Sequence, residues 1–193
     1  MSSRLFYTSI FFLLIIISSS FIDEGILFWN KNTRLSFDNF KGVPTVNDTS
    51  LIRTDKIYSA HRLGVFSKSI DVKLINKGGK TTFTIYAGMN QNHSWIRNKG
   101  DTVTLKHEQG HFDICETYTR ILREEIKNAK TLAEANELFN KISDDENIEQ
   151  DAYDKENTFQ LGGITVKWQE LIKEKLMALA AYQNPIIILP IYK

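Results

Sequence analysis

The sequence predicts an α+β domain in which a mostly antiparallel sheet comes first and helices follow. Two observations predict this order. Strand-like patterns occupy the chain from about residue 30 to residue 100, and apolar residues recur at helical spacing from residue 101 onward. Strands followed by helices are typical of α+β folds, and a chain of 193 residues is long enough for one domain with its own core.

The first half of the chain predicts a β-hairpin. Residues 70–75 and 81–86 alternate between apolar and polar side chains, and residues 76–80 between them include two consecutive glycines. Such a segment is a strong turn signal. Residues 34–40 and 57–66 also have strand-like patterns, so we expect them to contribute to the same sheet.

The first predicted helix begins at Asp101 or Thr102, either of which is a plausible N-cap, and extends to Ile126. A second helix begins at Thr131, which forms a capping-box pattern with Glu134.

A third helix is expected through the acidic residues 143–156 and ends before Gly162 and Gly163. The last helix spans roughly residues 166–181. The apolar tail, residues 186–192, is expected to pack on the domain as an extended segment.

The composition excludes several classes of protein. The chain has 24 basic and 23 acidic residues and a net charge of +1, whereas nucleic-acid-binding domains usually carry a clear basic excess. We therefore expect no nucleic-acid partner. The single cysteine, Cys115, excludes an internal disulfide and is expected to be a buried apolar residue.

Residues 1–20 have the features of a secretory signal peptide. Arg4 precedes an apolar run over residues 10–17, and the small residues Ser18–Ser20 follow. We expect cleavage near Ser20, a mature domain of residues 21–193 without a stable membrane span, and a periplasmic or secreted protein. The alternative is an uncleaved membrane anchor.

The chemistry-bearing motif is His107-Glu108-Gln109-Gly110-His111, an H-E-x-x-H pattern inside the first predicted helix. Residues four apart lie on one helix face, so both imidazoles can reach one Zn²⁺ at about 2.0–2.1 Å. Glu108 lies about 100° round the helix, where it can take a proton from a zinc-activated water. This spacing predicts a zinc site in which Glu108 is the general base.

A third metal ligand is not defined by spacing. No histidine follows His111, and Thr117 stands where the extended metzincin motif needs one. The ligand must then be a downstream carboxylate or a tyrosine. The candidates are Glu124, Glu125, Glu134, Glu137 and the acidic residues between Asp144 and Glu156.

Residues close to the motif have expected supporting roles. Gly110 is expected to keep the helix surface small beside the metal, so that a substrate or a strand can approach, and Asp113 is a possible acceptor for an imidazole N–H. Arg120 is expected to pair with Glu124 at a spacing of four, and His93 is expected at the surface.

The extended run around the motif, residues 105–120, resembles the signature of a bacterial secreted family known as domain of unknown function nine-two-two, whose members are regarded as zinc-dependent peptidases. Residues 35–44, 94–96 and 153–156, followed by Trp168, resemble further blocks of that family. The resemblance covers roughly residues 33–172. It implies a zincin-like peptidase domain that holds Zn²⁺.

The same resemblance places Asp154 or Tyr153 near the metal, with Asp154 as the expected third ligand. Tyr153 could instead donate a hydrogen bond to a developing oxyanion, or both residues could simply cap and pack the third helix. The chain departs from the family at Phe159-Gln160, where relatives carry His-Gly.

Two functional hypotheses follow from these residues. The first is an exported zinc metallopeptidase that hydrolyses peptide or protein substrates, with an extended substrate added as a strand beside residues 81–88. The second is a non-catalytic or degenerate relative that serves as an envelope binding protein.

Overall fold

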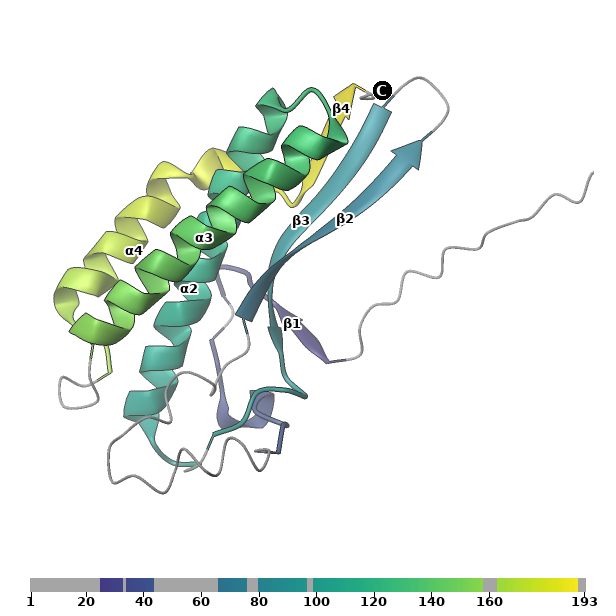
Figure 1. Cartoon of the computed structure of the whole chain (residues 1–193). Coiled ribbons are helices and arrows are strands. Elements are labelled where there is room, and N and C mark those ends of the chain that lie inside the picture. The colour runs from purple at the N-terminus through teal and green to yellow at the C-terminus, as the bar shows by residue number, and fades with distance from the viewer. Residues whose placement is uncertain are drawn as a thin grey trace, which may run out of the picture.

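The computed structural model describes residues 25–32, 34–43, 66–75, 80–96, 99–157 and 163–190. Within them the protein is an α+β domain with a small antiparallel sheet and three α-helices, as the sequence predicts (Figure 1). The expected signal peptide, most of the predicted strand at 57–66 and Phe159-Gln160 lie outside the described residues. No helix of the described part is both long enough and apolar enough to cross a membrane.

The sheet is organised around β3 (Lys80–Asn90), the partner of every other strand. β2 (Phe66–Ile75) forms the predicted hairpin with it, in a register that places Ile75 opposite Lys80. β4 (Ile186–Pro190) and β1 (Ile26–Phe28) pair with the two ends of β3. The tail of the domain is therefore extended and packed on the body, as expected.

The pairing of β3 excludes the expected addition of a substrate strand beside residues 81–88. β2 lies along one edge of β3, and β4 and β1 lie along the other. Between β4 and β1, the Ile85 amide donates to Pro185 O and Ala87 O accepts from the Trp29 amide. The expectation was wrong because the β1 and β4 segments fill the edge that it required.

Residues 34–40 do not form a strand. Leu35 and Phe40 are buried, but the residues between them turn through η1 (Phe37–Asn39), where Ser36 and Asn39 form a capping box. Local turn chemistry therefore outweighs the strand-like spacing of the apolar residues.

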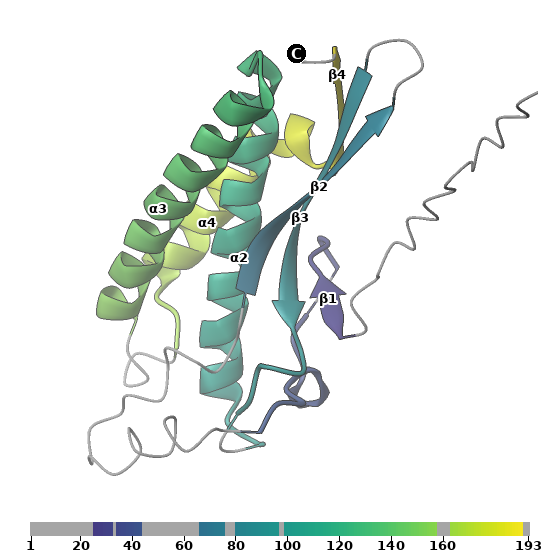
Figure 2. The same cartoon turned by 45° about the vertical axis from the view of Figure 1, so that its right-hand side comes forward.

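α2 (Thr102–Glu125) is the central helix and lies between the sheet and the other two helices, as Figures 1 and 2 both show. Its N-cap is Asp101, whose carboxylate accepts from the Val103 and Thr104 amides. The short helix η3 (Ile126–Asn128) follows it. Burial on several sides explains why α2 carries apolar residues over so much of its length.

α3 (Leu132–Glu156) is one continuous helix, whereas the sequence predicts two separate helices over these residues. Thr131 caps its start, as predicted, by accepting from the Glu134 amide at 3.1 Å. Residues 139–142 contain no glycine or proline, so nothing interrupts the helix where the predicted boundary fell.

α4 (Val166–Ala178) ends three residues before the predicted boundary and is followed by η5 (Ala180–Tyr182). A buried cluster made by Ile114, Tyr153, Trp168 and Ile172 fixes α3 and α4 against α2. On the opposite side of α2, alternate residues of β3, among them Phe83 and Met89, pack into two further clusters. The central helix is thereby held from both sides, which positions its motif.

Candidate metal centre

The H-E-x-x-H motif lies in the first half of α2, and its histidines face α3. His107 is 2% exposed and His111 is 9% exposed, one helical turn apart. Asp154 reaches them from the last turns of α3, although it is 47 residues from His107 in sequence. The packing of α3 on α2 therefore brings these three residues together.

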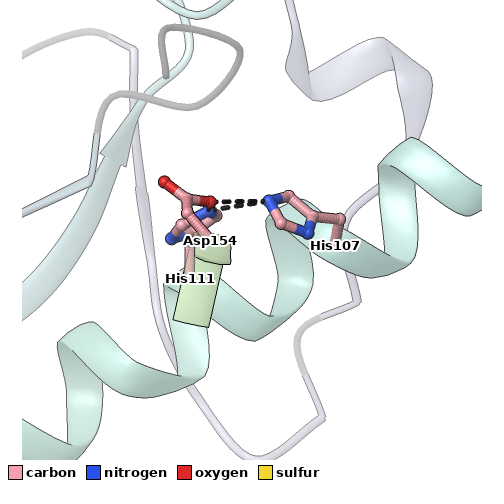
Figure 3. A group of neighbouring side chains, drawn as sticks. All are labelled: His107, His111 and Asp154. Atoms are coloured by element: carbon pink, nitrogen blue, oxygen red, sulfur yellow. Dashed lines mark hydrogen bonds and ion pairs between the residues drawn. The ribbon is translucent and has the colours of Figure 1, made fainter. Parts of the chain in front are cut away.

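The three side chains converge on one point (Figure 3). Asp154 Oδ1 lies 3.0 Å from His107 Nε2 and 2.9 Å from His111 Nε2, and the two Nε2 atoms are 3.0 Å apart. Together His107, His111 and Asp154 form a group that could hold a metal ion. Asp154 thus lies where the sequence resemblance implied.

The outer nitrogen of each imidazole has a partner that defines its protonation. His107 Nδ1 lies 2.9 Å from the carbonyl oxygen of Gly163, which can only accept, so this nitrogen carries the proton. His111 Nδ1 lies 2.5 Å from Gln150 Oε1. The amide of Gln150 is oriented by its donation from Nε2 to the His111 carbonyl, so Oε1 is again the acceptor.

With these tautomers, the two Nε2 atoms present lone pairs to each other and to a carboxylate oxygen. Burial raises the pKa of Asp154, but when the imidazoles carry a second proton on Nε2, their hydrogen bonds and charges outweigh burial and hold that pKa well below its ordinary value. The three donor atoms face one another at about 3 Å, a spacing that protons on the imidazoles or a shared metal ion would stabilise, and the group could hold such an ion. Two imidazoles and one carboxylate are a donor set that zinc accepts in proteins.

Tyr153 forms the wall behind the two imidazoles. It is fully buried, its ring is stacked on His107 at 4.9 Å, and it meets His111 edge to face at 4.8 Å. Its hydroxyl donates to the His107 carbonyl at 3.0 Å and to Gly163 O at 3.4 Å. Burial, followed by the negative charges of Glu108 and Asp154, raises its pKa, so the phenol stays neutral.

Glu108 is 1% exposed and is not one of the three convergent ligands. Its charge is nevertheless felt by Tyr153, which places the carboxylate within electrostatic reach of the group. This arrangement keeps Glu108 beside the donor cluster without making it a member.

Three expected supporting roles are different in the structure. A Cβ atom on Gly110 would lie 2.1 Å from the Tyr153 hydroxyl, so the glycine makes room for this tyrosine rather than for a substrate. Asp113 accepts from the Trp29 indole and from Gln109, not from an imidazole. Arg120 pairs with the preceding turn, at Glu116, and not with Glu124.

The remaining candidates lie outside the convergent group. The expected alternatives to Asp154 are not part of it, namely Glu124, Glu125, Glu134, Glu137 and the other acidic residues between Asp144 and Glu156. Cys115 is buried and His93 is exposed, both as predicted.

Sequence reasoning missed the two groups that hold the outer imidazole nitrogens. Gln150 lies one turn before Asp154 on α3, so a ligand assignment at Asp154 could have indicated it. From the sequence, Gly163 is predicted only to end the helix that precedes it. Its φ of +88° and a Cβ position 2.2 Å from Val103 O explain why a glycine stands there.

Comparison with protein families places part of the chain in a described family model. Residues 88–162 match the family model DUF922, described as a bacterial protein of unknown function. The matched segment contains all of α2 and α3, and therefore His107, His111 and Asp154, and it supports the family name that the sequence resemblance indicated. It is narrower than the resemblance over residues 33–172. No curated protein and no solved structure matches the chain.

Proposed function

We propose that the protein is a zinc-dependent peptidase with a zincin-like architecture. The observation that carries the proposal is the convergence of His107 Nε2, His111 Nε2 and Asp154 Oδ1 beside the buried Glu108. The match to DUF922 covers these residues. A helix that supplies two histidines and a glutamate, with the third ligand from a later helix, is consistent with catalytic zinc sites that use three protein ligands.

The three ligands would hold the ion, which would supply Lewis-acid activation of a water molecule and of the scissile carbonyl. The remaining chemistry belongs to the protein. Glu108 takes the proton of the attacking water and later passes it to the leaving amine. Its burial supports this role, because a carboxylate shielded from bulk water interacts more strongly with the groups that share its site.

Gly163 O and Gln150 Oε1 keep the proton on the outer nitrogen of each ring, so that the inner nitrogens stay available as ligands. The contacts of Tyr153 support a positioning role rather than the oxyanion-binding role considered from sequence. Its hydroxyl donates to two backbone carbonyl oxygens, and its ring fixes the orientation of both imidazoles.

Hydrolysis of an unbiased peptide library by the zinc-loaded protein tests the proposal. We expect cleavage by the wild type and a rate about 10²- to 10⁴-fold lower for Glu108→Gln, because this substitution keeps the size of the side chain but removes the base. Glu137→Gln is the matched control, since Glu137 is exposed on α3 and remote from the group in sequence. Its activity should equal that of the wild type.

The zinc content of the same samples separates the outcomes. Glu108→Gln should retain its zinc, and a variant that lost it would make Glu108 a ligand instead of a base. A wild type that binds zinc but cleaves no peptide would support the envelope binding protein in place of the enzyme.

We also propose that the protein is exported. Arg4, the apolar run over residues 10–17 and the serines that follow predict cleavage near Ser20. N-terminal sequencing of the periplasmic or secreted fraction should find a chain that begins close to residue 21. An intact Met1 on a cytoplasmic protein would contradict this proposal.

A further inference from the structure

A cavity of about 810 Å³ lies along α2, and none of the three residues of the metal group lines it. Lys106, Gln109, Asp113 and Arg120 contribute to it from α2, at spacings of three, four and seven residues. This spacing defines one helix face, which lies more than a quarter-turn from His107. The other walls are α4 and the segment that carries Trp29. None of His107, His111 and Asp154 lines the cavity, but Gly110, which packs on Tyr153, does, so the cavity and the metal group share part of α2 as a wall.

Positive charge is concentrated at this cavity. The described residues that line it include five cations and one acid, in a chain whose basic and acidic residues number 24 and 23 overall; the cations are Lys31, Arg34, Lys106, Arg120 and Lys173. The acid, Asp113, already accepts hydrogen bonds from Trp29 at 2.7 Å and Gln109 at 2.9 Å. A concave surface lined by charges of one sign raises the local concentration of the opposite sign.

Arg120 is the rigid cation of the cavity. It is 5% exposed, its Nε donates to Glu116 at 2.8 Å, and its Nη1 donates to Leu176 O at 2.7 Å. The guanidinium lies 5.2 Å from the centre of the Trp29 ring. Because Glu116 is its counter-ion, Arg120 forms a fixed inner wall of the cavity, and the other four cations of the cavity are the exposed ones.

The cavity is not only cationic. Trp29, Ile172, Leu176 and Met177 give it apolar surface, and Met177 is 65% exposed. Gln169 and Gln183 add side-chain amides, which can both donate to and accept from a peptide backbone. A small inorganic anion would leave the apolar wall uncovered, and an acyl chain would leave the amides without partners.

We propose that this cavity binds an acidic segment of a polypeptide substrate, one that carries both carboxylate and apolar side chains. The proposal rests on the peptidase function proposed above and adds the substrate class. The segment would be bound along α2 by residues outside the metal group, so it anchors a part of the substrate other than the bond that is cleaved. Selection by charge in such a cavity acts on substrate capture and not on the chemical step.

Binding of a labelled eight-residue peptide of alternating aspartate and leucine to the full chain tests the proposal by fluorescence anisotropy. The chain carries Glu108→Gln, so that the peptide stays intact. We expect saturable binding that weakens with added salt and binding at least about 10-fold weaker for the matched asparagine–leucine peptide. Equal affinity for the two peptides would overturn the proposal.

Substitutions with matched controls locate the bound peptide. Lys173→Glu and Met177→Glu put negative charge into the cavity and should each weaken binding about 10-fold. Lys130→Glu and Val166→Glu change exposed residues outside the cavity, one a lysine and one an apolar residue of α4, and should have less than a 2-fold effect. Unchanged binding in both cavity variants would overturn the proposal, because the peptide would then be bound elsewhere.

Two further measurements distinguish the alternatives. Vesicles that contain phosphatidylglycerol should not bind at this cavity. If vesicles bound, if Lys173→Glu abolished that binding, and if the acidic peptide did not bind, the partner of the cavity would be a membrane surface instead of a peptide. With Glu108 intact, the wild-type chain should cleave a short neutral peptide. If the protein cleaved peptides but did not bind the acidic peptide, the cavity proposal alone would be contradicted. If the acidic peptide bound at the cavity but no peptide was cleaved, the peptidase proposal alone would be contradicted.

Discussion

A Cβ atom at Gly110 would lie 2.1 Å from the hydroxyl oxygen of Tyr153. The absence of this carbon lets the phenol reach the carbonyl of His107 at 3.0 Å and pack its ring against both imidazoles. The glycine inside the H-E-x-x-H motif and the tyrosine that precedes Asp154 in sequence are therefore one structural unit. The approach of α3 to α2 depends on it.

Gly110→Ala should destabilise the protein by about 1–3 kcal/mol, the usual range for overpacking of a well-filled core. It should also weaken metal binding, since the displaced Tyr153 is adjacent to Asp154. Urea denaturation and metal titration measure the two effects. Lys106→Ala, an exposed position on the same helix, is the control and should cost less than about 0.5 kcal/mol.

A double-mutant cycle tests whether the clash is the cause. Gly110→Ala in a Tyr153→Leu background should cost clearly less than in the wild type, because the hydroxyl and the far end of the ring are gone. Equal costs in the two backgrounds would show that the glycine is needed for another reason.

Substitution of a metal ligand should lower the metal content of the protein, whereas substitution of a histidine outside the group should not. His107→Ala, His111→Ala and Asp154→Asn each remove or weaken one of three convergent donors. Loss of a group that supports a ligand from behind typically lowers metal affinity about 10- to 100-fold. Loss of a ligand itself should lower the affinity by more than this. His93→Ala, at an exposed position, should keep full occupancy in elemental analysis. If Asp154→Asn kept its metal, the third ligand would have to be another carboxylate.

Gln150→Leu should weaken metal binding about 10- to 100-fold without unfolding the protein, because it removes the acceptor that keeps the proton on His111 Nδ1. Asn147→Leu adds the same side chain at an exposed position of α3 and should leave metal affinity unchanged. Metal titration with a competing chelator measures both. Equal affinities in the two variants would contradict the role of Gln150.

The elements that the sequence predicted well are those whose signals are local. The N-cap at Asp101, the cap at Thr131 and the hairpin pairing of β2 with β3 depend on neighbouring residues, and all are confirmed. The two histidines on one helix face follow from spacing alone. Where two local signals competed, as at residues 34–40, the strand-like pattern lost to the Ser36–Asn39 capping box.

The rest of the site depends on the packing of distant segments. Asp154 lies 47 residues from His107 and came from a family resemblance, because periodicity cannot identify which of many carboxylates on α3 faces α2. The carbonyl of Gly163 carries no side-chain signal at all. Asp113 and Arg120 were given wrong partners because β1 and α4, which bring Trp29 and Leu176 close to them, had not been placed.

The start of α2 should depend on pH through Asp101. The hydroxyl of Thr104 and the amides that Asp101 caps lower the pKa of its carboxylate below the ordinary value of 3.8, against a smaller effect of burial. A carboxylate with a lowered pKa in the folded state stabilises the protein above pH about 4, and this stabilisation is lost as the pH falls further. Asp101→Ala should cost about 1 kcal/mol at neutral pH and much less at pH 3, measured by urea denaturation. An equal cost at both values would contradict the capping role.

Glu116→Gln should be the most destabilising single change on α2 outside the metal group. The carboxylate of Glu116 is 2% exposed, and its Oε1 accepts from Arg120 Nε at 2.8 Å and from Arg123 Nη1 at 2.9 Å. Arg120 also donates to Leu176 O, and Arg123 donates to Ile85 O and Tyr182 O, so the two arginines connect α2 to α4, β3 and η5. Burial lowers the pKa of Arg123 and the charge of Glu116 opposes this, so the carboxylate offsets part of the cost of burying this cation.

Loss of that charge leaves two buried guanidinium groups without their counter-ion, a change that typically costs about 3–5 kcal/mol. Glu125→Gln removes an exposed carboxylate from the last turn of the same helix and should change stability by less than about 0.5 kcal/mol. Urea denaturation compares the two. Because Glu116 lies about 180° round the helix from His107, the folded fraction of Glu116→Gln should bind metal with wild-type affinity. A cost no larger than that of Glu125→Gln would show that the ion network contributes little, whereas loss of metal from the folded protein would show that it also positions the histidines.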